Sequence, residues 1–422
     1  MRYNEPMRSV DINDIKKDFP LFQKHPRLVY LDSTATSLKP RIVIAKESEY
    51  YNEYSANVFR GIYQISEQAT SEYEETRTIV SRFINAKSAK EIVFTRNTTE
   101  SLNLIAYGLG RKIISAGNEI VVSVMEHHSN FVPWQVLASE SNADFKVIGV
   151  TPTGFLDIYD KKGKLSLNGI ITSRTKLLCL THVSNVTGVI NPIREIIAAA
   201  KKINPTIITI IDGAQSVPHM QVDVQYLGCD FLAFSSHKML GPTGVGVLYG
   251  KYELLDDMYP FLYGGEMIDE VFIEKTLYKE PPHKFEAGTP DIAGVSALKE
   301  AVAYLTRIGM SSVREHEREI TKYAIQSLMG EFGDQIQILG PADAERKGGI
   351  LAFTFGKIHT HDVAYILDEE NIAVRAGNHC AMPLHTFLKK PATTRASFYI
   401  YTNTSDVDAL VVGLKKVKKM LG

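Results

Sequence analysis

Short apolar runs alternate with helical stretches along much of the chain, from about Leu31 to Leu298. Apolar runs of four to eight residues bounded by turn-forming residues are typical of buried strands. The stretches Ser101–Leu109 and Ile193–Lys202 have the spacing of helices that fit between such strands. The predicted strands are Glu91–Phe94, Glu119–Ser123, Phe145–Ile148, Lys176–His182, Thr206–Ile211, Phe231–Ser235 and Gly246–Tyr249. This alternation predicts an α/β fold with a mainly parallel seven-stranded sheet covered on both faces.

The pattern changes after about residue 305, where fewer and shorter apolar runs occur. The predicted elements are an amphipathic helix Val313–Leu328, a strand Gly349–Phe355, a helix Val363–Leu367, a strand Ile372–Val374 and a final helix with an apolar stripe from Val407 to Leu421. Thr404 and Ser405 are the candidate caps of the final helix. This part of the chain is predicted to form a smaller α+β domain.

The N-terminal segment has Ile12, Ile15 and Phe19 at helical spacing, and Pro20 is predicted to end this short helix. The sequence therefore predicts three parts. Residues 1–25 form a helical segment that packs on the small domain, residues 26–304 form the large domain, and residues 305–422 form the small domain.

The composition excludes several classes of partner. The 47 Lys and Arg residues nearly cancel the 48 Asp and Glu residues, so no bulk charge attracts nucleic acid or an anionic membrane. No apolar run approaches the roughly 18 residues of a membrane helix. The N-terminus, which contains Asp11, Asp14 and Lys16, does not have the pattern of a signal peptide. Three cysteines cannot form a disulfide framework, which predicts a cytoplasmic protein.

Two polar motifs follow neighbouring predicted strands, at the edge where sheets of this kind bind ligands. Asp212 begins Asp212-Gly-Ala-Gln215, and Lys238 ends Ser235-Ser-His-Lys238. Taken singly, the Asp212 motif is as consistent with a simple turn as with a functional role, and the Lys238 motif favours a solvated lysine in a loop. Together they offer an acid for a pyridinium nitrogen and an amine for an aldehyde, which a pyridoxal 5′-phosphate site requires.

A third motif, Asn97-Thr-Thr-Glu100, opens the predicted helix Ser101–Leu109 with the spacing of a capping box. Backbone amides, the hydroxyls of Thr98 and Thr99 and the helix dipole would together bind a phosphate group. Alone, the motif would indicate only a helix cap. The glycine-rich stretch Gly241–Gly246 lacks the spacing of a dinucleotide fingerprint and leads into a strand, so we reject a nucleotide site there.

His127 follows a predicted strand, where its imidazole could stack on a flat cofactor ring. A metal site with Glu126 and His128 is the less favoured alternative, because the spacing matches no helical zinc motif, and we predict no metal.

The three cysteines differ in context. Cys179 and Cys229 lie in or beside apolar strands and are predicted to be buried. Cys380 lies in the loop Arg375–Pro383 next to His379, a setting that suits an accessible, activated thiolate.

The order of these motifs resembles that of SufS-type (group II) cysteine desulfurases, which belong to the class V aminotransferase fold family. The resemblance covers nearly the whole chain. It adds Tyr30-Leu-Asp-Ser-Thr-Ala35, Arg60-Gly61, Ser66-Glu-Gln-Ala69, Glu126-His-His128, His182-Val-Ser-Asn-Val-Thr-Gly188, Ala287-Gly-Thr-Pro290, His379-Cys-Ala-Met-Pro383 and Arg395-Ala-Ser397. The resemblance implies a type I pyridoxal-phosphate-dependent transferase that converts L-cysteine to L-alanine through an enzyme persulfide.

The resemblance also implies the roles of single residues. Lys238 would carry the cofactor and move protons at the substrate Cα, Asp212 would keep the ring nitrogen protonated, and Cys380 would take up the sulfur. Residues implied to bind the ring, the phosphate or the substrate are His127 (stacking and proton transfer), Gln215 (ring hydroxyl), Asn185 and Arg395 (substrate carboxylate), Thr98, Thr99, Ser235 and His237 (phosphate), and Thr289 (the phosphate in a neighbouring subunit).

The implied partners are a second copy of the chain in a homodimer with shared sites, and a sulfur-acceptor protein or iron–sulfur scaffold. A few positions depart from the family pattern, namely Asn378, Ser236, Phe59 and Tyr63. Selenocysteine lyase, a class V transaminase and a non-catalytic scaffold for iron–sulfur assembly are the alternatives. Cys380 disfavours a transaminase, which needs no thiol, whereas L-selenocysteine as the substrate stays open.

Overall fold

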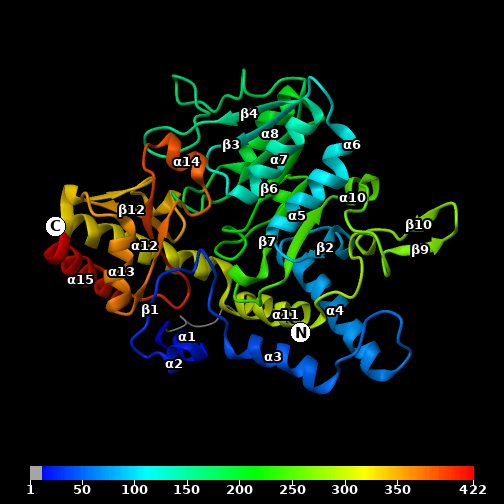
Figure 1. Ribbon diagram of the computed structural model, residues 1–422, viewed down its shortest axis with the longest axis horizontal. Helices are drawn as coiled ribbons and strands as arrows, with labels where there is room; N and C mark the ends of the chain where they lie inside the picture. Colours follow the sequence, from blue (N-terminus) through cyan, green and yellow to red (C-terminus); the bar gives the residue numbers. More distant parts are fainter. Residues whose placement is uncertain (1–11) are drawn as a thin grey trace.

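The computed structural model describes residues 12–422, and a seven-stranded sheet forms the centre of its larger part (Figure 1). The strand order is β2-β8-β7-β6-β5-β3-β4. The bounds are β2 (Ile92–Thr95), β3 (Glu119–Ser123), β4 (Asp144–Ile148), β5 (Thr175–Thr181), β6 (Ile208–Asp212), β7 (Phe231–Ser235) and β8 (Gly246–Gly250). The predicted strands are therefore confirmed, and only β8 runs antiparallel to its neighbours.

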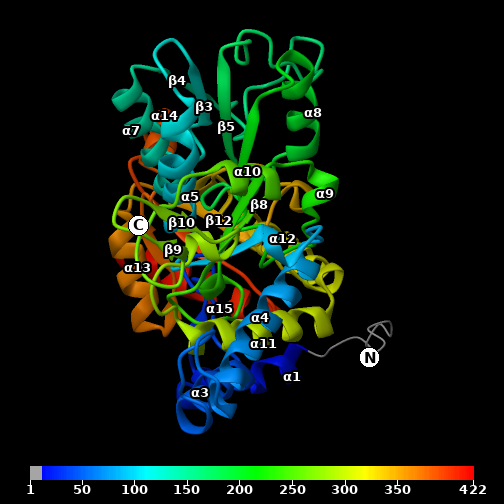
Figure 2. The same cartoon turned by 90° about the vertical axis from the view of Figure 1, so that its right-hand side faces the viewer.

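Alternate residues of each central strand pack into two separate cores. In β3, Val121 belongs to one hydrophobic cluster, while Ile120 and Val122 belong to the other. Because side chains alternate across a strand, each face of the sheet buries its own set. Helices close both cores, as the alternation predicted: α5 and α7 on one face, and α8 and α11 on the other (Figure 2).

Two helices of the larger part were predicted, and the one at Ile193–Lys202 is confirmed as α8, which ends one residue later. The helices of this part have the bounds α3 (Arg41–Glu53), α4 (Gln64–Phe83), α5 (Thr98–Ile105), α6 (Arg111–Ile113), α7 (Val132–Ser141), α8 (Ile193–Ile203), α9 (Val224–Leu227), α10 (Tyr252–Asp257) and α11 (Ile292–Ile308). The helix predicted at Ser101–Leu109 starts earlier and passes into a π-helical turn, Ala106–Gly110. It starts earlier because the Asn97 side chain accepts the amide hydrogen of Glu100 and caps it.

A second sheet of four antiparallel strands lies in the C-terminal part, in the order β11-β12-β15-β14. Its strands are β11 (Ile336–Ile338), β12 (Ile350–Phe355), β14 (Arg375–Gly377) and β15 (Thr393–Ser397), and its helices are α12 (Met310–Phe332), α13 (Thr360–Glu369), α14 (Met382–Phe387) and α15 (Thr404–Leu421). The short strand β1 (Val29–Tyr30) pairs with β13 (Ile372–Ala373), and Leu31 joins the core of this part. The domain boundaries stay a prediction.

Two predicted helix ends are wrong. The first helix, α1 (Ile12–Lys17), ends before Pro20, which begins a second helix, α2 (Pro20–Lys24). Proline suits this position because the first helical N–H has no partner within the helix. At the other end of the chain, the cap of α15 is Asn403 rather than Thr404 or Ser405, because Asn403 and Asp406 exchange hydrogen bonds in a capping box.

The N-terminal segment is anchored on both parts of the molecule. Lys16 pairs with Asp406 of α15 at 2.8 Å, and the Phe19 ring lies 4.9 Å from that of Tyr401 and 6.4 Å from that of Tyr304. Residues 1–11 of the predicted segment 1–25 lie outside the described residues. Within residues 12–422 no helix is long and apolar enough to cross a membrane.

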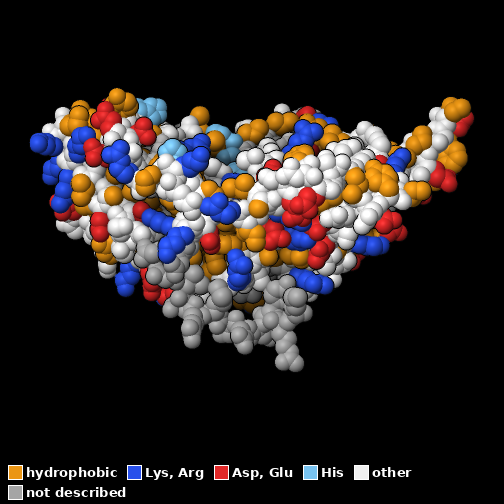
Figure 3. All heavy atoms as spheres, turned by 90° about the horizontal axis from the view of Figure 1, so that it is seen from below, with side chains coloured by type: hydrophobic (Ala, Val, Ile, Leu, Met, Phe, Trp, Pro, Cys, Tyr) orange, Lys and Arg blue, Asp and Glu red, His pale blue; other side chains and the backbone are white. Residues whose placement is uncertain are grey.

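A hairpin of β9 (Ile268–Val271) and β10 (Thr276–Tyr278) projects from the body of the molecule (Figures 1 and 3). Its tip carries exposed apolar side chains, among them Phe272 and Ile273, and Ile273 is fully exposed. An apolar tip that no other described residue covers marks a surface suited to contact with another molecule.

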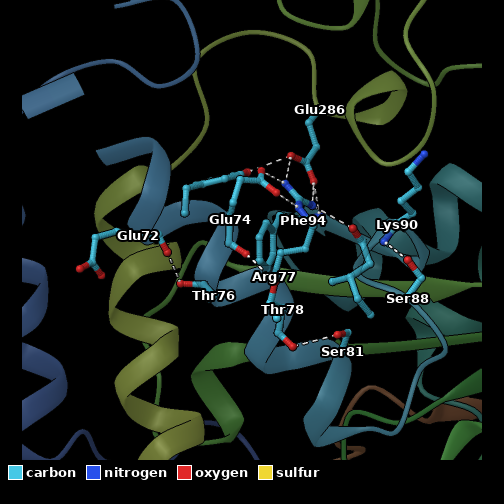
Figure 4. A network of polar contacts seen from close by, with 12 residues as sticks. Glu72, Glu74, Thr76, Arg77, Thr78, Ser81, Ser88, Lys90, Phe94 and Glu286 are labelled. Atoms are coloured by element: carbon cyan, nitrogen blue, oxygen red, sulfur yellow. Dashed lines mark hydrogen bonds and ion pairs between the residues drawn. The ribbon is translucent and has the colours of Figure 1, made fainter. Parts of the chain in front are cut away.

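A buried ion pair fastens α4 to the sheet beside the segment that leads into α11 (Figure 4). Arg77 is 1% exposed and donates to both carboxylate oxygens of Glu286, at 2.7 and 2.9 Å, and to the Ile92 carbonyl at 2.8 Å. Glu286 also accepts the amide hydrogen of Phe94 at 2.7 Å. The pair therefore ties α4, β2 and the Glu286–Pro290 segment together.

We expect Arg77→Met to lower the free energy of unfolding by about 3–5 kcal/mol, because Glu286 would be left buried and unpaired. Urea denaturation followed by circular dichroism would measure this change. Adding Glu286→Gln to that variant should recover part of the loss, since no charge is then stranded. Lys90→Met, which breaks the exposed pair with Glu280, is the control and should leave the midpoint unchanged. Equal effects of Arg77→Met and Lys90→Met would contradict the prediction.

Candidate active site

A cavity of about 270 Å³ lies where the carboxyl ends of β5, β6 and β7 meet the start of α5 and the edge of the second sheet. Ten of the predicted site residues line it: Thr98, Thr99, His127, Asn185, Asp212, Gln215, Ser235, His237, Lys238 and Arg395. The structure therefore brings these ten residues together at the strand ends, where sheets of this kind bind ligands. Two predicted residues, Cys380 and Thr289, are not among those that line the cavity.

Asp212 and Lys238 are the oppositely charged groups at the base of the cavity. Asp212 ends β6, and its Oδ1 accepts the amide hydrogen of Ala214 at 2.9 Å. Burial raises the pKa of Asp212, and the nearby ammonium of Lys238 counteracts this rise. Burial lowers the pKa of Lys238 to about 8, against the opposing pull of Asp212. An amine with this pKa is partly neutral near physiological pH and can attack a carbonyl group.

The start of α5 forms a polar cradle next to these two residues. The Thr98 amide donates to the Ser235 Oγ at 2.8 Å, and the hydroxyls of the two residues lie 2.6 Å apart. A Cβ at Gly246 would come within 2.5 Å of the Asn97 backbone, so only glycine lets β8 approach this turn. Hydroxyls and a helix N-terminus form a site suited to a phosphate group.

His127 lines the same cavity and holds its proton at a defined atom. Its Nδ1 accepts the backbone N–H of Ser129 at 3.1 Å, so the neutral ring carries its hydrogen on Nε2. Burial lowers the pKa of His127 to about 3, and the positive charge of Lys238 contributes further to this decrease. The ring is therefore neutral over the working pH range.

Cys380 lies in a short loop between β14, which ends at Gly377, and α14, which begins at Met382. Two contacts with the larger part hold this loop: Asn185 Nδ2 donates to the His379 carbonyl at 2.7 Å, and the His128 amide donates to the Cys380 carbonyl at 2.7 Å. The Cys380 sulfur is half-buried and lies 3.8 Å from Nη2 of Arg375.

The other two cysteines are buried, as predicted. Burial raises the pKa of Cys229 to about 12 and that of Cys179 well above its ordinary value, so neither forms a thiolate near neutral pH. Cys380 is thus the one cysteine of the chain that combines access with a cationic neighbour.

Arg395 links the two parts of the molecule at the cavity wall. Its Nη1 donates to the Asn185 carbonyl at 3.0 Å, and its Nη2 donates to Asp32 at 3.1 Å. Sequence reasoning missed Arg375, which pairs in register with Arg395 across β14 and β15 and also lines the cavity. Arg375 directly follows the predicted strand Ile372–Val374, and its strand-end position was the signal that could have identified it.

Several buried polar atoms at the cavity have no hydrogen-bond partner within residues 12–422. They are Thr34 Oγ1, Asn185 Oδ1, Gln215 Oε1, His379 Nδ1 and Arg395 Nε. Buried polar groups are nearly always paired, so this cluster fits a polar ligand that completes the pairing. With Asp212, Lys238 and the α5 cradle around it, the donor and acceptor set fits pyridoxal 5′-phosphate.

Thr289 lies away from this cavity and lines a separate one of about 340 Å³ with Arg96 and Glu100. Within one chain it therefore does not join the other predicted residues. In the part of the chain that the structure describes, no three His, Cys, Asp or Glu side chains are grouped as metal ligands would be.

Comparison with known proteins agrees with this geometry. The sequence profile of the family described as aminotransferase class-V matches residues 29–410. A probable cysteine desulfurase of Streptomyces coelicolor is 46% identical over 421 residues, covering 98% of each chain. A cysteine desulfurase of Yersinia pestis is 43% identical over 415 residues, covering 97% of this chain and 99% of its own.

Solved structures show the same fold. The crystal structure of the cysteine desulfurase CsdA from Escherichia coli, in an S-sulfonic acid form, has a TM-score of 0.89 and 36% identity over 98% of this chain and all of its own. The apo cysteine desulfurase of Thermococcus onnurineus has a TM-score of 0.90 and 40% identity over 98% of this chain and 99% of its own. The chain therefore belongs to the aminotransferase class-V family, and the predicted type I fold and enzyme class, cysteine desulfurase, are confirmed.

We expect the Lys238 amine of the cofactor-free protein to be modified with a pH midpoint near 8, because burial lowers its pKa to about that value. An exposed lysine should titrate near its ordinary value of about 10.4. Brief labelling with an amine-directed reagent across pH 6–11, mapped by mass spectrometry, would measure both midpoints in one sample. A Lys238 midpoint at the ordinary value of about 10.4 would contradict the assigned environment.

Proposed function

We propose that this chain is a pyridoxal-phosphate-dependent cysteine desulfurase in which Lys238 carries the cofactor and Cys380 takes up the sulfur of L-cysteine. The observation that supports this most directly is the buried Asp212 and Lys238 pair in a cavity beside a half-buried cysteine on a short, anchored loop. When bound, pyridoxal 5′-phosphate supplies an electron sink for the substrate Cα.

The chain's own residues would divide the remaining work. Lys238 moves the proton at the substrate Cα, and Asp212 keeps the ring nitrogen protonated. Arg395, and Arg375 beside it, bind the substrate carboxylate through their planar guanidinium groups. His127 presents Nε2–H and can donate a hydrogen bond to the ring or the substrate. Gln215 and Asn185 offer unpartnered oxygens to the ring and the substrate.

The sulfur transfer step would take place at Cys380. Its thiolate attacks the substrate sulfur, so that an S–S bond forms while the Cβ–S bond breaks. The electron pair of the broken bond stays on Cβ, which takes up a proton and becomes the methyl group of L-alanine. Nη2 of Arg375 lies 3.8 Å from the Cys380 sulfur and can donate a hydrogen bond to it.

The short cysteine loop supports membership of the SufS-type subgroup. Four residues join β14 to α14, and contacts from Asn185 and His128 hold two of their carbonyls. L-Selenocysteine would place its selenium where L-cysteine places sulfur, so it is the second candidate substrate. We infer a location in the cytoplasm from the composition and the three unpaired cysteines.

We further propose a homodimer with shared sites. Thr289 faces a cavity of its own, and the neighbouring hairpin presents Phe272 and Ile273 to the surroundings. A second exposed apolar segment lies before α4, where Ile62 is 96% exposed and Tyr63 is 53% exposed. Monomers rarely leave such segments uncovered, and a second copy of the chain would bury both.

We expect Cys380→Ala to bind L-cysteine but to release neither L-alanine nor sulfide, because the nucleophile for the substrate sulfur is missing. Amino-acid analysis and a sulfide assay of the holoenzyme would measure the products. Cys229→Ala, which removes a buried thiol, is the matched control and should retain activity. Mass spectrometry should map the trapped persulfide to Cys380. Keto-acid production would indicate a transaminase. If the native protein shows no turnover at all, this would indicate a non-catalytic scaffold.

We expect slow turnover with L-cysteine alone and at least about a tenfold increase when a thiol-bearing acceptor is added, because the anchored loop cannot carry the persulfide far. The acceptor is proposed to be a small sulfur-accepting protein or an iron–sulfur scaffold. Steady-state L-alanine production with and without a small reducing thiol measures the effect. Fast turnover that no acceptor changes would show that the loop imposes no such limit.

A further inference from the structure

A buried chain of three side chains lies directly behind the cysteine loop, and none of the roles proposed above uses it. His379, Thr393 and His385 are all 2% exposed or less. The Thr393 hydroxyl lies 2.9 Å from Nε2 of His379 and 3.3 Å from Nε2 of His385. The hydroxyl therefore bridges two imidazoles, and it has only one hydrogen to donate.

The hydrogen-bond pattern determines where each proton lies. Nδ1 of His385 faces the carbonyl of Ala381 at 3.1 Å, and a carbonyl only accepts, so this nitrogen carries the hydrogen. Nε2 of neutral His385 is then an acceptor, and the Thr393 hydroxyl donates to it. With its hydrogen used, the hydroxyl can only accept from His379, whose Nε2 must donate. His379 is thereby left with a bare Nδ1.

The bare Nδ1 of His379 is one of the buried atoms without a partner within residues 12–422, and His379 lines the active-site cavity. We propose that His385 and Thr393 act as positioning residues that fix the tautomer of His379, so that its Nδ1 accepts a hydrogen bond from a thiol in the cavity. This inference deepens the proposed function and rests on it.

A thiol is the donor that the proposed reaction leaves available. The substrate carboxylate can only accept, and the substrate nitrogen is committed to the cofactor. The cationic groups that face His379 are Arg395 on β15 and Arg375 on β14, and neither donates to its Nδ1. Among the groups that the proposed reaction brings, the remaining donors are the S–H of bound L-cysteine and the S–H of Cys380, the next residue in the chain.

Protonation of His385 would reverse the chain. His385 would then donate from Nε2 to Thr393, whose hydroxyl could donate to His379 and move the His379 hydrogen to Nδ1. Burial lowers the pKa of His385, so the neutral form described above prevails near neutral pH. Burial, Arg395 and His385 lower the pKa of His379 to about 2, so His379 stays uncharged and acts as an acceptor rather than a base.

The test compares Thr393→Val, which removes the hydroxyl, with Thr393→Ser, which keeps it, in the holoenzyme. His385→Leu is a second route to the same loss. His316→Leu is the control for removal of another histidine of the small domain, since Nε2 of His316 bonds to the Thr402 carbonyl and takes no part in this chain of side chains. Nitrogen-15 NMR of labelled histidines should show His379 with a bare Nδ1 in the wild type and in Thr393→Ser, and a mixture of tautomers in Thr393→Val.

Two further measurements identify the thiol. If it belongs to Cys380, the pH midpoint for alkylation of Cys380 should fall by about half a unit in Thr393→Val, because an Nδ1–H tautomer stabilises the thiolate. If it belongs to the substrate, alkylation stays unchanged, and KM for L-cysteine rises about threefold relative to the inhibition constant of L-alanine, which has no thiol.

A protonated Nδ1 in wild-type His379 would overturn the inference, as would identical behaviour of Thr393→Val and Thr393→Ser in both measurements. The tautomer and the alkylation midpoint are read without turnover. They therefore stay informative if the wild type produces no L-alanine, the outcome that would refute the proposed function instead.

Discussion

The excess of buried positive charge around the cavity is the constraint on which the rest of the site depends. Lys238, Arg375 and Arg395 converge there, and Asp212 and Asp32 are the carboxylates that face them. Burying cations without equal counter-charge is costly, and their pKa values respond: that of Lys238 is lowered to about 8 and that of Arg395 to about 10. The cavity is therefore suited to bind anions. The proposed reaction brings three anionic groups to it: a phosphate, a carboxylate and a thiolate.

The charged groups around the cavity come from two separate sheets, whose relative position has to be fixed. The larger sheet supplies Asp212 and Lys238 from adjacent strand ends, while the smaller sheet supplies Arg375 and Arg395 from paired strands. Contacts across the boundary join them, most directly those of Asn185, whose backbone carbonyl accepts from Arg395 and whose side chain binds the cysteine loop. One residue of the large part therefore contacts both Arg395 and the cysteine loop.

The sequence predicted the strands that are buried on both faces, because continuous apolar runs reveal them. It did not reveal β15, whose residues Thr393–Ser397 are polar except for Ala396, although all are buried. This strand is buried although it is polar, because Arg395 lines the cavity and Thr393 bonds to His379 beside it. A strand of this kind has no apolar pattern to reveal it. The antiparallel direction of β8 could not be predicted either, since an apolar run does not show in which direction its strand will run. Ten of the twelve residues that the motifs singled out line one cavity, whereas Arg375 needed the register of β14 against β15 to appear.

The conformation of the cysteine loop connects these features to the chemistry. His379 and Cys380 both have positive φ angles, 52° and 57°, a region that residues with side chains seldom adopt. Two such residues in succession persist only when their surroundings hold them, and here Asn185 and His128 bind the two carbonyls. The loop therefore stays where the backbone contacts place it. In the proposed reaction, a sulfur carried on Cys380 would therefore stay where this loop is held, and an acceptor would have to approach the loop rather than the loop travel to the acceptor.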